Sequence, residues 1–202
     1  MNEENWIKWS RELFSIAQTG ITYAKSKYEE ERFRRVYEIA GEIIKIESNI
    51  LPKNANELYI QKGYATPQIT TRGIIKRGNS ILLVHEIGKK WNLPGGYADI
   101  NDTPTQAVIR EVFEETGYYV QVKGIVAIYS ILHNMVFPQY AMYFLCTVDE
   151  SKKVLPLSNE TDIAQFVNIN EIISYDLNQH LKDHWLRLKQ LIMEENLCKE
   201  VD

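Results

Sequence analysis

The stretch GGYADINDTPTQAVIREVFEETG, residues 95–117, decides how this chain is interpreted. It holds three glutamates, Glu111, Glu114 and Glu115, close together after Arg110. No lysine or arginine follows any of them one helical turn later, where a helix commonly places a compensating charge. The fold and the function therefore depend on what neutralises these carboxylates.

Local signals place most of this stretch in one helix. Thr103–Gln106 matches a capping box with proline at the first helical position, and Gly117 is suited to end the helix. Because residues three and four apart share a helix face, the three glutamates can converge on one side. Val108 and Val112 can then cover the core side.

The acidic cluster needs a cation, since like charges at this spacing repel one another and repel more strongly when partly buried. Arg110 can bind one or two carboxylates but cannot neutralise three. A divalent ion such as Mg²⁺ or Mn²⁺ can, because it prefers carboxylate and carbonyl oxygens. Gly95 and Gly96 supply a side-chain-free backbone whose carbonyl can reach the same ion. A solvated acidic helix face is the simpler alternative.

Composition limits the class of protein. The chain has 202 residues, a net charge of -4 and 45% hydrophobic residues, which fits one substantial core with a small appendage. It has no apolar run of about 18 residues, no basic leader and no disulfide framework, so we expect a cytoplasmic protein without a membrane segment. The mildly acidic charge argues against a DNA-binding surface.

The first part of the chain is helical in pattern. Apolar residues recur at helical spacing from about Glu4 to Ser48, with a break near residues 25–28, and Pro52 follows. Two helices of this size cannot bury both apolar stripes by themselves. We therefore expect this pair, residues 1–52, to dock on the rest of the chain or on a second copy, giving a homodimer.

The pattern then changes to short β-type runs around the acidic helix. A turn at residues 76–79 separates the first two runs, and a closing helix is expected at residues 177–197. Strands with one central and one terminal helix favour an α/β/α sandwich. The expected strands are residues 69–75, 80–86, 119–132, 137–148 and 163–169.

The spacing in the quoted stretch resembles the Nudix box. Gly96 is followed by five residues, then Asp102, then seven residues, then the run from Arg110 to Tyr118. The resemblance implies an α/β Nudix fold over residues 65–202 and divalent-metal-dependent hydrolysis of a nucleoside diphosphate linked to another group. It also implies that Arg110 organises the site and that the metal ligands are Glu111, Glu114, Glu115 and the carbonyl of Gly95 or Gly96.

Two further carboxylates are candidates for catalysis. Asp102 stands where the Nudix family usually has glutamate, and the shorter side chain can still accept a hydrogen bond or orient water. Glu160 lies at a place where the family often contributes another acidic loop residue. It is either a base or ligand, or a solvated loop charge.

The helical pair adds a weaker resemblance, to the N-terminal domain of a bacterial Nudix subgroup that includes CDP-choline pyrophosphatase. This implies a dimer whose helical domain contributes to the site, with CDP-choline as the first substrate and ADP-ribose or a nucleotide sugar as alternatives. A non-enzymatic alternative is a ligand-sensing regulator that keeps the fold, and the intact glutamates speak against it.

Other residues are weaker candidates. His180 and His184 have the spacing of a metal-binding pair, but without a third ligand we interpret them as surface or packing residues. His133 and the pair Lys89–Lys90 can touch substrate or can be ordinary loop residues. Aromatic candidates for stacking or cation–π contact are Trp6, Trp9, Tyr129 and Tyr140, of which the two tryptophans are expected to pack on their helix.

Overall fold

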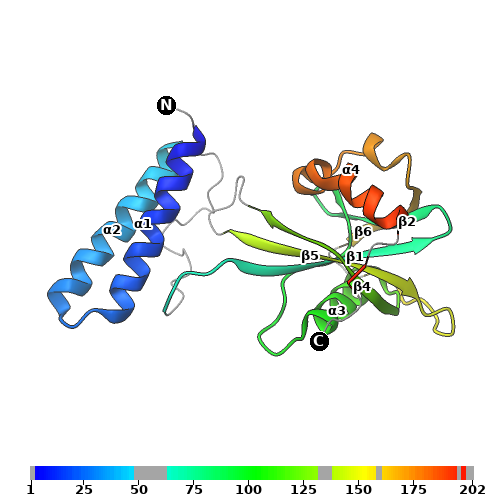
Figure 1. Ribbon diagram of the computed structural model, residues 1–202, viewed down its shortest axis with the longest axis horizontal. Coiled ribbons are helices and arrows are strands. Elements are labelled where there is room, and N and C mark those ends of the chain that lie inside the picture. The colour runs from blue at the N-terminus through cyan, green and yellow to red at the C-terminus, as the bar shows by residue number, and fades with distance from the viewer. Residues whose placement is uncertain (1–2, 48–62, 132–137, 158–160, 195–196, 199–202) are drawn as a thin grey trace. The chain divides into compact units, whose positions relative to one another are not determined.

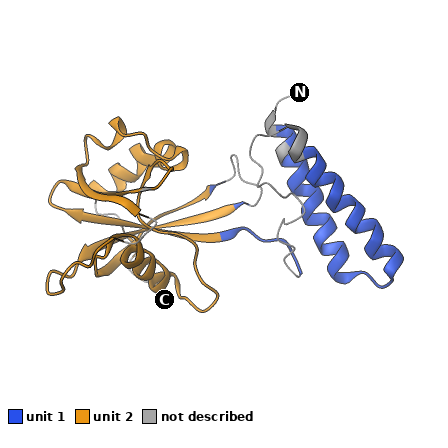
Figure 2. Cartoon of the chain, turned by 180° about the vertical axis from the view of Figure 1, so that it is seen from behind, with its two compact units in different colours: residues 1–68, 131–138 blue, residues 69–130, 139–202 orange. Residues whose placement is uncertain are grey.

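The computed structural model describes residues 3–47, 63–131, 138–157, 161–194 and 197–198. The chain divides into two compact units, coloured separately in Figure 2. One contains residues 1–68 with 131–138, and the other contains residues 69–130 with 139–202.

The first unit is built on a helical hairpin (Figure 1). Helix α1 spans Glu3–Tyr23 and α2 spans Lys27–Glu47. The hydroxyl of Ser26 accepts a hydrogen bond from the backbone N–H of Glu29 at 3.2 Å, which satisfies one of the otherwise unpaired donors at the start of α2. The break between the two helices, residues 24–26, overlaps the break predicted near residues 25–28 and ends two residues earlier.

The two helices pack closely along their facing sides. The buried hydroxyl of Ser10 on α1 donates to the carbonyl of Ala40 on α2. At Gly20 a Cβ atom would lie 2.2 Å from the ring of Phe33, so only glycine permits this approach. The rings of Phe14 and Tyr37 meet edge to face at 4.7 Å.

The second unit contains a six-stranded sheet with the order β3-β2-β1-β5-β4, in which β6 pairs with β2. β1 and β2 form an antiparallel hairpin in which Lys76 pairs with Ile81. β2 and β6 are also antiparallel, with Ile81 opposite Val167. The strands are β1 Gln68–Arg77, β2 Ser80–Glu86, β3 Trp91–Asn92, β4 Val120–Ile131, β5 Gln139–Val148 and β6 Thr161–Asn168.

Two helices cover the sheet. Figure 1 shows α3, Pro104–Thr116, and α4, Gln179–Met193, on opposite sides of the strands, which confirms the predicted α/β/α sandwich. A core cluster joins α3 to the sheet through Ile75, Leu82, Val108, Val112, Val120, Phe144 and Cys146. The side that α4 buries consists of Leu181, Trp185, Leu188 and Ile192.

The ends of α3 follow the sequence signals. Thr103 and Gln106 form the capping box, and Gly117 ends the helix in the left-handed conformation with φ 69°. At Gly73 on β1 a Cβ atom would lie 2.6 Å from Val112, so the missing side chain lets α3 approach the sheet. These contacts set the distance of α3 from the sheet and the rotation of this acidic helix about its own axis.

Several features differ from the expectations. The turn predicted at residues 76–79 is confined to Gly78 and Asn79, because Lys76 and Arg77 belong to β1 and pair with Ile81 and Ser80. Helix α4 is shorter at both ends than residues 177–197. The two-residue strand β3 and a 3₁₀ turn at Ile172–Ser174 are absent from the sequence prediction. Cys198 pairs with Ile125 on β4 through reciprocal backbone hydrogen bonds of 2.9 and 3.0 Å, a pairing that the sequence patterns do not predict.

Candidate active site

Arg110 lies at the centre of the acidic face of α3. Its Nε and Nη2 donate to one oxygen of Asp102 at 3.0 and 2.8 Å. Its Nη1 donates to Glu111 at 2.8 Å and to Glu114 at 3.1 Å, and Nη2 also reaches the carbonyl of Tyr97 at 3.1 Å. One guanidinium therefore fixes three of the predicted site carboxylates through charge-assisted hydrogen bonds.

Burial differs among these groups. The side chains of Glu111 and Asp102 are 15% and 19% exposed, whereas that of Glu114 is 55% exposed. Burial raises the pKa of Glu111, although its hydrogen bond with Arg110 acts in the opposite direction. Burial by itself lowers the pKa of Arg110, but the hydrogen bonds to Asp102 and Glu111 raise it above the ordinary value. The guanidinium is therefore a permanent positive charge here.

Glu115 is held by the glycine segment. The backbone N–H of Gly95 donates to Glu115 Oε2 at 2.8 Å. Next to it, a Cβ atom on Gly96 would lie 2.4 Å from Glu111 Oε2, so the bare backbone leaves the space that this carboxylate fills. Gly95 itself has φ 139°, which favours glycine, and a Cβ there would lie 2.1 Å from the carbonyl of Thr71.

Both candidate carbonyl ligands already accept a hydrogen bond. The Gly96 carbonyl accepts from the N–H of Thr71 at 2.8 Å, and the Gly95 carbonyl accepts from Arg72 Nη1. A carbonyl oxygen has two lone pairs, so either can accept a second interaction.

The donor set fits a hard divalent cation. It offers carboxylate and carbonyl oxygens, and the largely buried carboxylate of Glu111 lies beside a glycine whose missing side chain makes room for it. Within the described part of the chain, no three acidic, histidine or cysteine side chains already converge as a metal-binding group. Arg110 draws Glu111 and Glu114 to itself, while the Gly95 amide holds Glu115.

The remaining sequence candidates lie elsewhere or outside the described residues. Glu160 and His133 fall outside the described ranges. His184 stacks on Tyr129 with ring centres 4.2 Å apart, which agrees with the packing interpretation. Lys90 pairs with Asp176 at 2.9 Å, and this pair is solvent-exposed.

The aromatic candidates are mostly exposed or packed against neighbours. Trp6 and Trp9 pack edge to face at 5.3 Å, but Trp9 remains 41% exposed. The expectation that both tryptophans pack on the apolar face of their helix therefore holds only in part. Tyr140 is 46% exposed.

The sequence interpretation missed Arg72. This residue lies on β1, is half-buried, and binds the segment that carries Gly95. The signal was present as a lone arginine inside the apolar run ITTRGII, where an unpaired charge would be costly. Its partner could not be read from the sequence because it lies 23 residues away.

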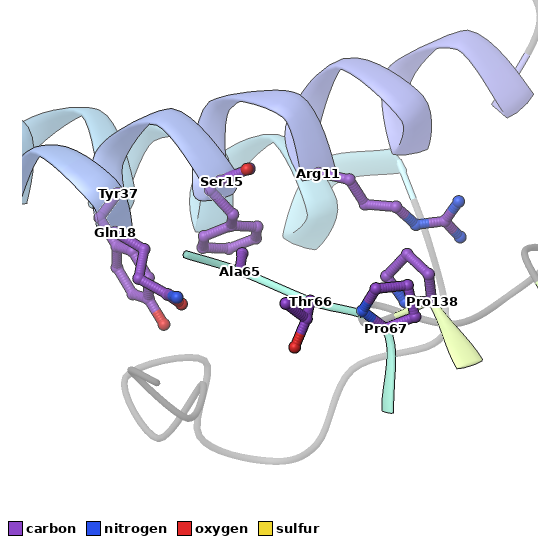
Figure 3. A pocket seen from close by; sticks show the side chains of 9 residues that line it. Arg11, Ser15, Gln18, Tyr37, Ala65, Thr66, Pro67 and Pro138 are labelled. Atoms are coloured by element: carbon purple, nitrogen blue, oxygen red, sulfur yellow. The ribbon is translucent and has the colours of Figure 1, made fainter. Parts of the chain in front are cut away.

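A separate cavity of about 160 Å³ lies within the helical unit (Figure 3). Its size is close to that of cavities that hold one small ring. Burial lowers the pKa of Arg11 at its edge. It contains none of the predicted catalytic residues and is lined by Arg11, Phe14, Ser15, Gln18, Tyr37, Ala65, Thr66, Pro67 and Pro138.

Comparison with known families gives two matches. Residues 4–59 match the UDP-X-like, N-terminal oligomerisation domain, and residues 66–191 match the NUDIX domain. The second match covers more than half of the chain and contains the whole Arg110 site. None of the described helices is both long and apolar enough to cross a membrane.

Individual relatives agree with these matches. The chain is 28% identical over 156 residues to the YjhB protein of Bacillus subtilis, covering 74% of this chain and 75% of YjhB. It is 26% identical over 165 residues to an ADP-ribose pyrophosphatase of Methanocaldococcus jannaschii, covering 75% and 95%. A solved UDP-X diphosphatase has the same fold over 100% of both chains, with a TM-score of 0.60 and 22% identity.

The domain match, the sandwich fold and the carboxylates gathered around Arg110 lead to the same conclusion. This chain belongs to the Nudix family and is a Nudix hydrolase.

Proposed function

We propose that this enzyme hydrolyses the diphosphate of a nucleoside diphosphate linked to another moiety, giving a nucleoside monophosphate and a phosphorylated product. The observation that carries the proposal is the arrangement around Arg110, Glu111 and Glu115 beside the glycine segment. Water attacks one phosphorus of the anhydride, and the bond to the bridging oxygen breaks. The departing phosphate leaves with that oxygen.

The proposed metal ligands are Glu111, Glu114, Glu115 and the carbonyl of Gly95 or Gly96. A bound Mg²⁺ or Mn²⁺ supplies charge neutralisation for the phosphate oxygens and lowers the pKa of a bound water. Nudix hydrolases generally use divalent ions, and the choice between these two belongs to the proposal.

The chain's own residues have separate roles in this proposal. Arg110 keeps two glutamates in fixed rotamers, and Asp102 anchors Arg110 through two hydrogen bonds to one oxygen. Glu160 is kept as a candidate base or ligand, as the sequence predicts. A carboxylate that does not bind metal would take the proton from the attacking water.

For the substrate we place ADP-ribose first, since the Methanocaldococcus jannaschii relative carries that activity in its name. A UDP-linked compound comes second because the helical segment matches a UDP-X-like domain. CDP-choline, the first substrate suggested by the sequence resemblance, remains in the panel. All three share the diphosphate on which the proposed chemistry acts.

The proposed assembly is a homodimer through α1. Trp9, Ile16 and Tyr23 are 41%, 56% and 58% exposed and are spaced by seven residues, so they form one apolar stripe along the helix. The matched domain is described as an oligomerisation domain. We further propose a helical domain at residues 1–52, a hydrolase domain at residues 65–202, and a cytoplasmic location.

The test is a panel of ADP-ribose, UDP-glucose and CDP-choline with Mg²⁺ or Mn²⁺, analysed for nucleoside monophosphate by chromatography. The proposal expects monophosphate from at least one compound and its loss after EDTA. Metal-saturated protein that cleaves none of the three, or cleavage that survives EDTA, contradicts the proposal.

A further inference from the structure

The segment Leu93–Gly96 is held to β1 along its whole length. The N–H of Gly73 donates to the Pro94 carbonyl at 2.8 Å, and the N–H of Thr71 donates to the Gly96 carbonyl at 2.8 Å. These two bonds join backbone to backbone and therefore do not depend on the side chains of β1.

The other two carbonyls of the segment depend on one side chain. Arg72 Nη1 donates to the Gly95 carbonyl and, at 3.3 Å, to the Leu93 carbonyl. Arg72 is half-buried. Within the described part of the chain, its hydrogen-bond acceptors are these two carbonyls and not a carboxylate. A partly desolvated charge normally requires such partners, so this contact is a specific one.

The Gly95 peptide links Arg72 to the acidic helix. Arg72 donates a hydrogen bond to the Gly95 carbonyl, and the Gly95 N–H donates one to Glu115 at 2.8 Å. Arg72 also acts at a distance on Glu111, whose pKa burial raises and the charge of Arg72 lowers. A single guanidinium thus contacts the glycine segment and lies within electrostatic reach of a proposed ligand.

We propose that Arg72 is a positioning residue for the metal site. It fixes the orientation of Gly95, so that the N–H keeps Glu115 in place and the carbonyl keeps a lone pair for the ion. The inference rests on the proposed function and extends it to a residue outside the Nudix box. Positioning partners of metal ligands commonly change metal affinity by roughly 10- to 100-fold when they are removed.

Whether the removal of Arg72 weakens or strengthens cation binding distinguishes a positioning role from simple charge repulsion. Arg72 carries a positive charge, so its removal would strengthen cation binding if charge repulsion were its main influence. If positioning dominates, removal weakens cation binding because Gly95 and Glu115 lose their alignment. The two accounts predict opposite signs.

The experiment compares Arg72→Met and Arg72→Lys with a matched control, Arg77→Met, which removes an exposed arginine from the same strand. In metal-free protein, amide hydrogen exchange at Leu93, Gly95 and Gly96 should be at least about tenfold faster in Arg72→Met. Mn²⁺ binding, followed by electron paramagnetic resonance, should weaken by about tenfold or more. Arg72→Lys should lie between this variant and the unmodified protein, since an ammonium can donate to one of the two carbonyls.

Unchanged exchange in Arg72→Met, or Mn²⁺ binding that is unchanged or tighter, overturns the inference. So does an equal effect in Arg77→Met. If Arg72→Met does not fold, Arg72→Lys carries the same comparison, and exchange and Mn²⁺ affinity equal to those of the unmodified protein overturn the inference. Neither readout needs a substrate, so failure of the substrate panel would contradict the proposed hydrolysis while leaving this test intact.

Discussion

At the scale of single residues, Asp102 shows how a departure from the family pattern is accommodated. The sequence left its role open because aspartate is one methylene shorter than the usual glutamate. In the structure it lies close enough for Arg110 to donate two hydrogen bonds to one oxygen, at 3.0 and 2.8 Å. The path of residues 97–102 brings Asp102 to Arg110, and the spacing of residues in the sequence does not reveal that path.

Gly96 provides a prediction at this scale. Gly96→Ala places a Cβ atom 2.4 Å from Glu111 Oε2, so the carboxylate must move. We expect turnover to fall by roughly 100-fold, since a misplacement of about 1 Å in a group that sets the reactive geometry has that cost. The measurement is kcat on the best substrate of the panel, with the melting temperature recorded alongside.

Gly78→Ala is the matched control for this substitution. Gly78 has φ 59°, and no atom lies within 4 Å of the point where the alanine Cβ would stand, so alanine there strains the backbone without touching the site. Equal losses of turnover in the two variants would show that the loss at Gly96 reflects general destabilisation.

At the scale of elements, α3 owes its position to its caps. Thr103→Ala removes the capping hydroxyl and half of the capping box, so we expect a loss of about 1 kcal/mol in the free energy of unfolding. Urea unfolding measures this value. Asn178→Ala removes the cap of α4, which carries none of the proposed ligands.

The two cap variants should have similar stability but different metal binding. Loss of the α3 cap loosens the helix that bears the glutamates, so only Thr103→Ala should weaken Mn²⁺ affinity. A stability unchanged by Thr103→Ala, or equal Mn²⁺ affinities in both variants, would argue against this role of the cap.

Strand β5 gives a second element-scale prediction. Burial raises the pKa of the Cys146 thiol to about 12, so almost no thiolate is present at pH 8. Cys198 is exposed. A thiol reagent such as DTNB should therefore label one cysteine of the folded protein rapidly and the other only after unfolding. Rapid labelling of both thiols in the folded protein would contradict the buried position of Cys146.

Elements with strong local signals were predictable and those fixed by distant contacts were not. The caps of α3 are encoded by Thr103, Gln106 and Gly117. The sequence predicts the turn before β2 at residues 76–79, but this turn occupies only Gly78 and Asn79, because Lys76 and Arg77 extend β1. Strand β3 has two residues and exists because β2 pairs with it. The pairing of Cys198 with Ile125 joins positions 73 residues apart, 198 minus 125, which no local pattern indicates.

The candidate site likewise has features that the sequence predicts and features that it does not. The identity of the acidic residues follows from the box, but the contacts that orient them involve Tyr97, Gly95 and Arg72, which are distant in sequence from the glutamates. Periodicity predicts which side chains share a helix face. It does not predict which strand residue reaches that face.

At the scale of the whole molecule, the apolar stripe on α1 tests the proposed assembly. Ile16→Lys places a charge at a position that is 56% exposed in the single chain and would be desolvated in a dimer. We expect the dimer to dissociate at micromolar concentration, as measured by sedimentation or by light scattering after size exclusion.

Glu31→Lys at an exposed position of α2 is the control, because it also introduces a lysine but is on the other helix and not part of the stripe. It should leave the mass unchanged. An unmodified protein that is monomeric under these conditions, or an Ile16→Lys variant with the mass of the unmodified protein, would contradict the proposed interface.

The central claim is that the carboxylates of α3 bind a divalent ion on which hydrolysis depends. The most direct measurement is a Mn²⁺ titration by electron paramagnetic resonance of the unmodified protein, Glu115→Gln and the surface control Glu150→Gln. We predict that Glu115→Gln weakens Mn²⁺ binding by at least about tenfold and abolishes turnover while unfolding at a similar temperature, with Glu150→Gln unchanged. Mn²⁺ affinity and turnover in Glu115→Gln equal to those of the unmodified protein would contradict it.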